Sequence, residues 1–216
     1  MEALIAKLAI AALPVVLAIT LHEAAHAYAA RYFGDPTAAL MGRISLNPLR
    51  HIDLMGTLIL PILCMTLSGG AMLFGYAKPV PVDFRRLRQP KQDMLWVAAA
   101  GPGANLVMAL IWGALQALVM ALPTTGYTYA LASMGEYGIR INLILMLLNL
   151  LPLPPLDGGR IVTSLLPLRL AIPFSRIEPF GFPILVVLLI TGVLGGILGP
   201  LLNLAFLFIR AIFPLH

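Results

Sequence analysis

The stretch LHEAAHAYAA, residues 21–30, lies near the end of an apolar run that covers residues 3–30. It places His22, Glu23 and His26 inside a segment that is long enough to cross a membrane as a helix. An ionisable side chain in such a segment is costly unless it is paired or bound. Three of them within five positions therefore need a common explanation.

The spacing of these three residues is that of a metal site. His22 and His26 are four positions apart, so both imidazoles lie on one face of a helix, one turn from each other. Glu23 is placed to reach a metal-bound water without being a ligand, and H-E-x-x-H on a helix is the arrangement of zinc hydrolases. The sequence therefore predicts that His22 and His26 bind one zinc ion. The alternative is a pair of histidines that are only satisfied, buried core residues.

The composition is that of an integral membrane protein. The chain has 216 residues, of which 60% are hydrophobic and 11% charged, against about 45–50% and about 25% in soluble domains. The net charge of +5 comes from basic residues in short loops between apolar runs. This pattern favours a lipid bilayer as the partner and excludes nucleic acid. One cysteine, Cys64, excludes an intramolecular disulfide and a cysteine-only zinc site.

The order of apolar runs predicts an all-α polytopic membrane protein, a single domain over residues 1–216, with about four to five transmembrane helices. GRISLN, residues 42–47, is strand-like and could receive an unwound substrate segment by strand addition. The alternative is that this stretch is only a connector at the membrane interface. The predicted segments are a span at 3–30, a strand-like loop at 31–55, a re-entrant hairpin or span at 56–75, a span at 94–122, a polar connection at 123–138, a short span with LDG at 139–157 and one or two spans at 180–213.

A catalytic zinc ion needs a third protein ligand and one open position. Among the candidates Asp157 stands out, because it follows PLPP and precedes two glycines, so the helix breaks there and the backbone can approach closely. The alternative is an interfacial turn in which Asp157 caps the next helix. The other candidates are His51, Asp53, Cys64, Asp83, Asp93, Glu136 and Glu178.

HEAAH together with NLLPLPPLDGGR resembles the site-2 protease family of intramembrane zinc metalloproteases. GRISLNPLRHIDLMGTLILP, FGYAKPVPVD and AGPGANLVMA extend the resemblance over most of residues 15–165, and its pattern is that of the short prokaryotic branch without a PDZ or CBS domain. The resemblance implies that His22, His26 and Asp157 bind zinc and that Glu23 is the general base. It also suggests that Asn149 stabilises the oxyanion, and it leaves a role of Asn105 in packing or substrate contact open.

Ligands of one ion must lie at one depth in the membrane. The ends of the predicted spans at 3–30 and 139–157, which carry the candidate ligands, are therefore expected on the same side. Residues 56–75 are then expected to be re-entrant. That side carries most of the positive charge, which predicts a cytoplasmic site in a prokaryotic inner membrane. Its basic residues are Arg31, Arg43, Arg50, Lys78, Arg85, Arg86, Arg88, Lys91, Arg160, Arg169 and Arg176.

The predicted function is hydrolysis of peptide bonds in or near transmembrane segments of membrane protein substrates. The alternative is a membrane transporter or metal-ion carrier, which would also bury His and Asp side chains beside broken helices. Glu23 discriminates between the two, because a carrier has no need of a carboxylate beside a bound water.

Overall fold

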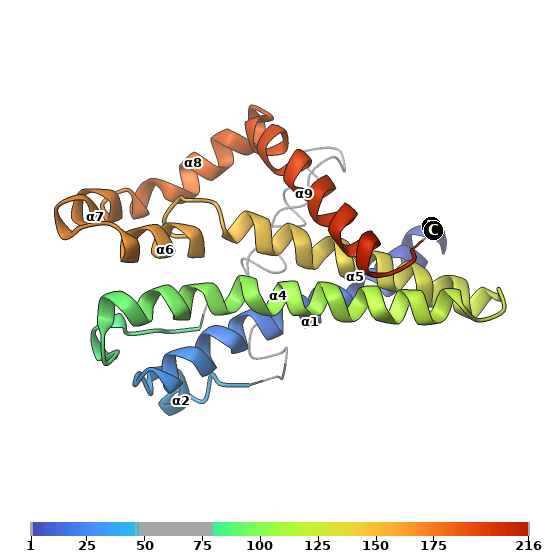
Figure 1. Ribbon diagram of the computed structural model, residues 1–216, viewed down its shortest axis with the longest axis horizontal. Helices are drawn as coiled ribbons and strands as arrows, with labels where there is room; N and C mark the ends of the chain where they lie inside the picture. The colour runs from blue at the N-terminus through green and yellow to red at the C-terminus, as the bar shows by residue number, and fades with distance from the viewer. Residues whose placement is uncertain (1, 46, 48–79, 216) are drawn as a thin grey trace.

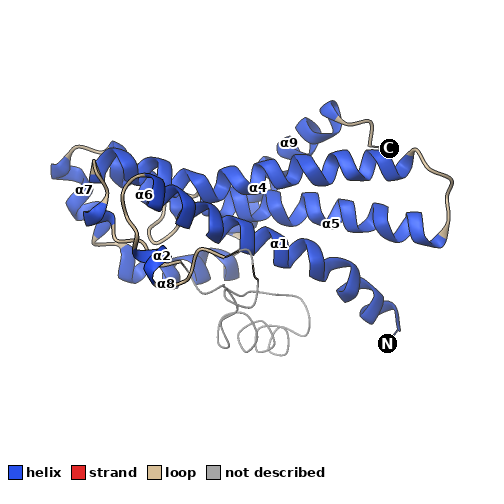
Figure 2. Ribbon diagram, turned by 90° about the horizontal axis from the view of Figure 1, so that it is seen from below, coloured by secondary structure: helices blue, strands red, loops and turns tan. Residues whose placement is uncertain are grey.

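The structure, a computed structural model, describes residues 2–45, 47 and 80–215. All regular structure in these residues is helical (Figures 1 and 2). The elements are α1 (Glu2–Tyr32), α2 (Thr37–Leu40), the 3-10 turn η3 (Phe84–Arg86), α4 (Pro90–Met120), α5 (Gly126–Asn149), α6 (Asp157–Leu165), α7 (Leu168–Ser175), α8 (Glu178–Ile190) and α9 (Val193–Ile212).

Three long helices form the centre of the molecule. α4 packs against α1, α5 and α6 and runs antiparallel to α1 and α5, so the last part of α1 and the helix α6 that follows α5 lie beside the first part of α4 (Figure 1). α4 starts with a proline at its first position, and the Asp93 carboxylate accepts a hydrogen bond from Gln89 N–H at 2.7 Å. This alignment brings side chains far apart in sequence to the same level.

Glycines let α4 and α5 approach closely. A Cβ on Gly138 would lie 2.3 Å from the Trp112 ring, and one on Gly135 would lie 2.8 Å from the Gln116 side chain. Small residues at such interfaces are typical of helix packing in membranes. The buried core beside them contains Met108, Ala109, Trp112, Ile139, Leu143 and Ile209.

α5 begins thirteen positions earlier than the predicted span at 139–157, so most of the expected polar connection at 123–138 is helical. The reason is local. Thr125 caps the helix, with its hydroxyl accepting from Thr128 N–H at 3.2 Å while Thr125 N–H donates to Thr128 Oγ1 at 2.7 Å. The polar residues that follow are compatible with a helix because most of them lie on its exposed side.

Four helices in the described residues are long and apolar enough to cross a membrane, or five if the bent pair α7–α8 counts as one span. They are Ala9–Tyr32 within α1, α4, α5 and α9, and the bend between α7 and α8 is 63°. This confirms the all-α membrane fold. Of the predicted strand-like stretch, residues 43–45 and 47 form neither helix nor strand. Leu46 and the predicted re-entrant segment at 56–75 lie outside the described residues.

Polarity is distributed as expected for a membrane protein. Large apolar side chains cover the outside, for example Leu118, Ile190 and Leu204, each more than 60% exposed. Polar side chains are instead buried between the helices, and they include His22, Asn105, Asn142 and Asp157. Buried polar groups in such a setting mark functional sites.

Candidate metal centre

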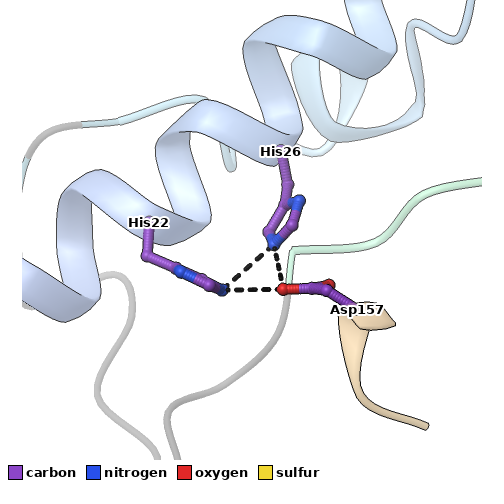
Figure 3. Close-up of side chains that lie close together, drawn as sticks. All are labelled: His22, His26 and Asp157. Carbon is purple, nitrogen blue, oxygen red and sulfur yellow. Dashed lines mark hydrogen bonds and ion pairs between the residues drawn. The ribbon is translucent and has the colours of Figure 1, made fainter. Parts of the chain in front are cut away.

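Two histidines from α1 and one aspartate from α6 converge on one point (Figure 3). The Nε2 atoms of His22 and His26 are 3.1 Å apart, and Asp157 Oδ2 lies 3.3 Å from each of them. One donor atom from each residue can be chosen so that all three lie within 4.8 Å of one another. The structure thus brings together the three residues that the sequence proposed as ligands.

The turn before α6 places Asp157. A Cβ on Gly158 would lie 2.3 Å from the carbonyl oxygens of Leu150 and Leu151, and one on Gly159 would lie 2.3 Å from Pro154 N. The two glycines therefore let α6 start directly against the end of α5. Asp157 is the first residue of α6, and no side chain caps the start of this helix. The Asp157 carboxylate therefore contacts the histidines and does not cap the helix.

Hydrogen bonds at the other ring nitrogen fix how each histidine is protonated. His26 Nδ1 lies 2.7 Å from the carbonyl oxygen of Val97, which can only accept, so Nδ1 carries the hydrogen. His22 Nδ1 lies 2.6 Å from Asn105 Oδ1. In the neutral rings both Nε2 atoms then present a lone pair to the cluster.

The orientation of the Asn105 amide follows from its other contacts. Its Nδ2 donates to the carbonyl oxygen of Ala18 at 3.2 Å and to Asn142 Oδ1 at 2.9 Å. Asn142 Nδ2 in turn donates to the Gly138 carbonyl at 2.8 Å. With both amide hydrogens of Asn105 engaged, its oxygen faces His22. A chain of hydrogen bonds across α1, α4 and α5 therefore sets the tautomer of His22.

The cluster combines two lone pairs and one carboxylate, a set of donor atoms that could hold a metal ion. Asp157 Oδ2 is buried and has no hydrogen-bond donor among the described residues. A metal ion satisfies the same three atoms, and two imidazoles with one carboxylate are a catalytic zinc set that leaves a fourth position open.

Gly101 of α4 leaves space beside the cluster. A Cβ at this position would lie 2.3 Å from His26 Nε2 and 2.6 Å from His22 Cε1. Any side chain there would therefore occupy the space in front of the ligand nitrogens. Gly101 and Asn105 are one helical turn apart, so α4 provides both the free space and the hydrogen-bond acceptor.

The two proposed catalytic residues differ in their surroundings. Glu23 is half-buried, and its Oε2 accepts a hydrogen bond from Val80 N–H at 2.8 Å. Asn149, also half-buried, lies near the end of α5, and its Nδ2 donates to the Leu145 carbonyl of the same helix at 3.0 Å.

The other candidate ligands that the structure describes are engaged elsewhere. Asp83 pairs with Arg86 at 3.3 Å, and Asp93 binds the start of α4. Glu136 pairs with Arg140 at 3.4 Å, and Glu178 pairs with Arg160 at 3.7 Å. The remaining three, His51, Asp53 and Cys64, lie outside the described residues.

Sequence reasoning did not identify Gly101 or Asn142 and left Asn105 open. The available signal was weak. Asn105 and Asn142 are isolated amides in apolar spans, which is costly in a membrane unless both are hydrogen-bonded. Two such residues in neighbouring spans could have been paired with each other, but the contact of Asn105 with His22 depends on how three helices align.

Comparison with known proteins agrees with the site. The family model for peptidase family M50 matches residues 10–137 and 125–192. A Bacillus subtilis protein, YwhC, is 38% identical over 191 residues, which cover 87% of this chain and 83% of YwhC. Rip2 of Mycolicibacterium smegmatis is 33% identical over 175 residues, covering 81% of this chain and 64% of Rip2. Both relatives carry the name "Putative zinc metalloprotease".

No solved structure is significantly similar to this chain. The family match and the relatives agree with the three-ligand cluster and the membrane-type helices described above. The chain therefore belongs to peptidase family M50, as an integral membrane zinc metalloprotease.

Proposed function

We propose that this metalloprotease cleaves peptide bonds in or near transmembrane segments of other membrane proteins, with zinc held by His22, His26 and Asp157. The observation that carries the proposal is the position of the cluster. Both histidines lie within the candidate span Ala9–Tyr32, and Asp157 reaches them from the helix that follows another candidate span, α5. A hydrolytic site between such helices suits a substrate that is itself in the membrane.

The residues around the cluster have separate roles in the proposed reaction. When bound, zinc supplies a Lewis acid and lowers the pKa of a coordinated water. Glu23 accepts a proton from the water as its oxygen attacks the peptide carbonyl carbon. It then delivers that proton to the amine nitrogen as the C–N bond breaks. Asn149 donates to the carbonyl oxygen as negative charge develops there, which requires its amide to turn away from Leu145.

The substrate class follows from backbone chemistry. A transmembrane helix engages its carbonyl groups in its own hydrogen bonds, so the segment must unwind before attack. Spans that contain helix-breaking residues are therefore the expected substrates.

The first test measures zinc and cleavage in the same preparation. The protein is reconstituted in liposomes with a panel of doubly tagged single-span proteins whose spans contain helix-breaking residues. We expect about one zinc per chain, loss of zinc in Asp157→Ala, and in Glu23→Gln loss of cleavage with zinc retained. Glu136→Gln is the matched control, because its carboxylate is exposed and pairs only with Arg140 in the described structure.

The results separate the possible functions. A parent protein that holds no zinc after reconstitution would contradict the proposed site. Full cleavage by Glu23→Gln would contradict the general-base role. Metal transport that persists in Glu23→Gln, without any cleavage by the parent, would favour a carrier.

We also propose that the site faces the cytoplasm of a prokaryotic inner membrane. Exposed basic residues gather at the end of the molecule that holds the end of α1, η3, the start of α4 and α7, and cytoplasmic loops carry such an excess. In a Cys64→Ser background, we expect a membrane-impermeant maleimide to label Thr124→Cys in intact cells. Ser175→Cys should react only after permeabilisation. Reversed labelling would place the site on the other side.

A further inference from the structure

An extended segment, Val80–Asp83, passes beside the proposed general base. Val80 N–H donates to Glu23 Oε2 at 2.8 Å, across 57 positions of sequence. Val80 is only 8% exposed, so this hydrogen bond is shielded from solvent. A hydrogen bond to a charged acceptor is stronger than one between neutral groups. The contact therefore holds one oxygen of the carboxylate and leaves Oε1 for another partner.

Prolines flank Val80 on both sides. It stands in Lys78-Pro79-Val80-Pro81, and proline has no N–H, so residues 79–81 offer one amide hydrogen. A residue before proline is restricted to extended backbone. Val80 is therefore restricted by its own sequence and presents its N–H with little loss of conformational freedom.

A buried carboxylate anchors the other end of the segment. Asp35 is 0% exposed, and its Oδ2 accepts from Asp83 N–H at 2.7 Å. Its Oδ1 accepts from Thr37 N–H at 2.9 Å and from Thr37 Oγ1 at 2.5 Å. A fully buried carboxylate with three donors is a strong, specific attachment. Asp35 thus ties the extended segment to the turn that follows α1.

Side-chain packing supports the same placement. Val80 packs in one cluster with Ala27 and Ala38, and Ala27 lies one helical turn after Glu23. The segment is therefore held at three points, by the Val80 amide, by the Val80 side chain and by Asp35.

We propose that the Val80 amide is a positioning group for the Glu23 carboxylate and that Asp35, through the segment Val80–Asp83, is a positioning residue for the same base. The inference rests on the proposed role of Glu23. A general base acts only within hydrogen-bond reach of its proton, and a glutamate with three free torsions spends much of its time elsewhere. Fixing Oε2 on a rigid donor directs Oε1 to the attacking water.

Hydrogen exchange tests the contact without any substrate. In the zinc-loaded protein, overlapping proteolytic fragments that differ by residues 79–81 report the exchange of Val80 alone, because both neighbours are prolines. We expect exchange at Val80 to be about tenfold faster in Glu23→Ala and in Asp35→Asn, from loss of one charge-assisted hydrogen bond. Thr37→Val, which removes only the hydroxyl donor to Asp35, should leave it unchanged. Unchanged exchange in Glu23→Ala would overturn the proposal.

The kinetics of cleavage test the positioning role of the Val80 amide. They are measured on the substrate of the panel that the parent protein cleaves fastest. Val80→Pro removes the donor, and Val82→Pro is the matched control, because Val82 N–H has no acceptor among the described residues. We expect Val80→Pro to lower kcat about tenfold, a fraction of what a general base contributes, with KM and zinc content as in Val82→Pro. A raised KM at constant kcat, faster cleavage, or loss of zinc would each overturn the positioning role.

Failure of this inference is distinguishable from failure of the proposed function. If Glu23→Gln keeps full cleavage, or the parent binds no zinc, the proposed function is wrong, whatever Val80 does. If Val80→Pro does not fold, the exchange measurement on Glu23→Ala and Asp35→Asn decides the contact, and kcat in Asp35→Asn replaces that of Val80→Pro.

Discussion

His22 Nδ1 lies 2.6 Å from Asn105 Oδ1, although 83 positions separate the two residues in the sequence. The asparagine oxygen accepts the Nδ1 hydrogen, so the opposite ring nitrogen faces Asp157 with a lone pair. An amide of α4 thus orients a histidine of α1 in the way that the proposed metal site needs.

Removal of this amide should weaken zinc binding. In Asn105→Leu, His22 loses its acceptor, and we expect zinc affinity to fall by about 10- to 100-fold, the usual effect of losing a partner of a ligand histidine. Competition with a chromogenic chelator measures the affinity. Asn203→Leu is the control, because this exposed asparagine lies on α9. Equal affinity in Asn105→Leu and the parent would contradict the role of the amide.

A methyl group at Gly101 should prevent zinc from binding. The Cβ would lie 2.3 Å from His26 Nε2, in the space that the ligand atoms face. A Cβ on Gly103, two positions further along α4, would meet no other part of the described chain within 4 Å, so Gly103→Ala makes the same change without such a clash. We expect Gly101→Ala to purify without zinc and Gly103→Ala to retain it, as measured by elemental analysis. Zinc retained by both variants would contradict this prediction and would show that α4 can move away from α1 to admit the methyl group.

Acid should release zinc. Two imidazoles must be neutral to bind, so below an ordinary histidine pKa of about 6.5 protons compete with zinc. With two competing protons, the affinity should fall by up to about 100-fold per pH unit. Dialysis against buffers from neutral to acid pH, followed by zinc analysis, measures the release. A flat profile down to strongly acid pH would contradict two histidine ligands.

Truncation of Asn149 should lower the rate of cleavage and leave the zinc content unchanged. Its Nδ2 is engaged with the Leu145 carbonyl, so it can be truncated without removing a contact of the three ligands. If it donates to the developing oxyanion, Asn149→Ala should lower kcat by about 100- to 1,000-fold while zinc content stays constant. A rate within a few-fold of the parent would leave the oxyanion to zinc and other donors.

A methyl group at Gly138 should destabilise the pair α4–α5. Its Cβ would lie 2.3 Å from the Trp112 ring, and such overpacking costs about 1–3 kcal/mol. Gly126→Ala, at the start of the same helix, is the control, because a Cβ there would meet none of the other described segments within 4 Å. Unfolding in mixed micelles with increasing SDS measures both variants. Because the Gly138 carbonyl accepts from Asn142, we expect Gly138→Ala also to weaken zinc binding slightly.

Some helices of the fold could be predicted from the sequence and others could not. The spans at 3–30 and 94–122 agree with α1 and α4 within a few residues, because long apolar runs have few alternatives in a membrane. The start of α5 was not predictable in the same way. Its first turns contain glycine, threonine and glutamate, and hydropathy gives no signal for a helix that is stabilised by its cap and by close packing on α4.

Three candidate ligands could be named from the sequence. A spacing of four places His22 and His26 on one helix face, which follows from the local geometry of one segment. Asp157 is favoured over seven other candidates by the prolines and glycines around it and by the resemblance to the site-2 protease family. The tertiary structure alone decided that Asn105 orients His22, that Gly101 leaves the space, and that Val80 meets Glu23. These contacts join residues 57 or more positions apart, so they depend on how helices pack and align, which no local pattern specifies.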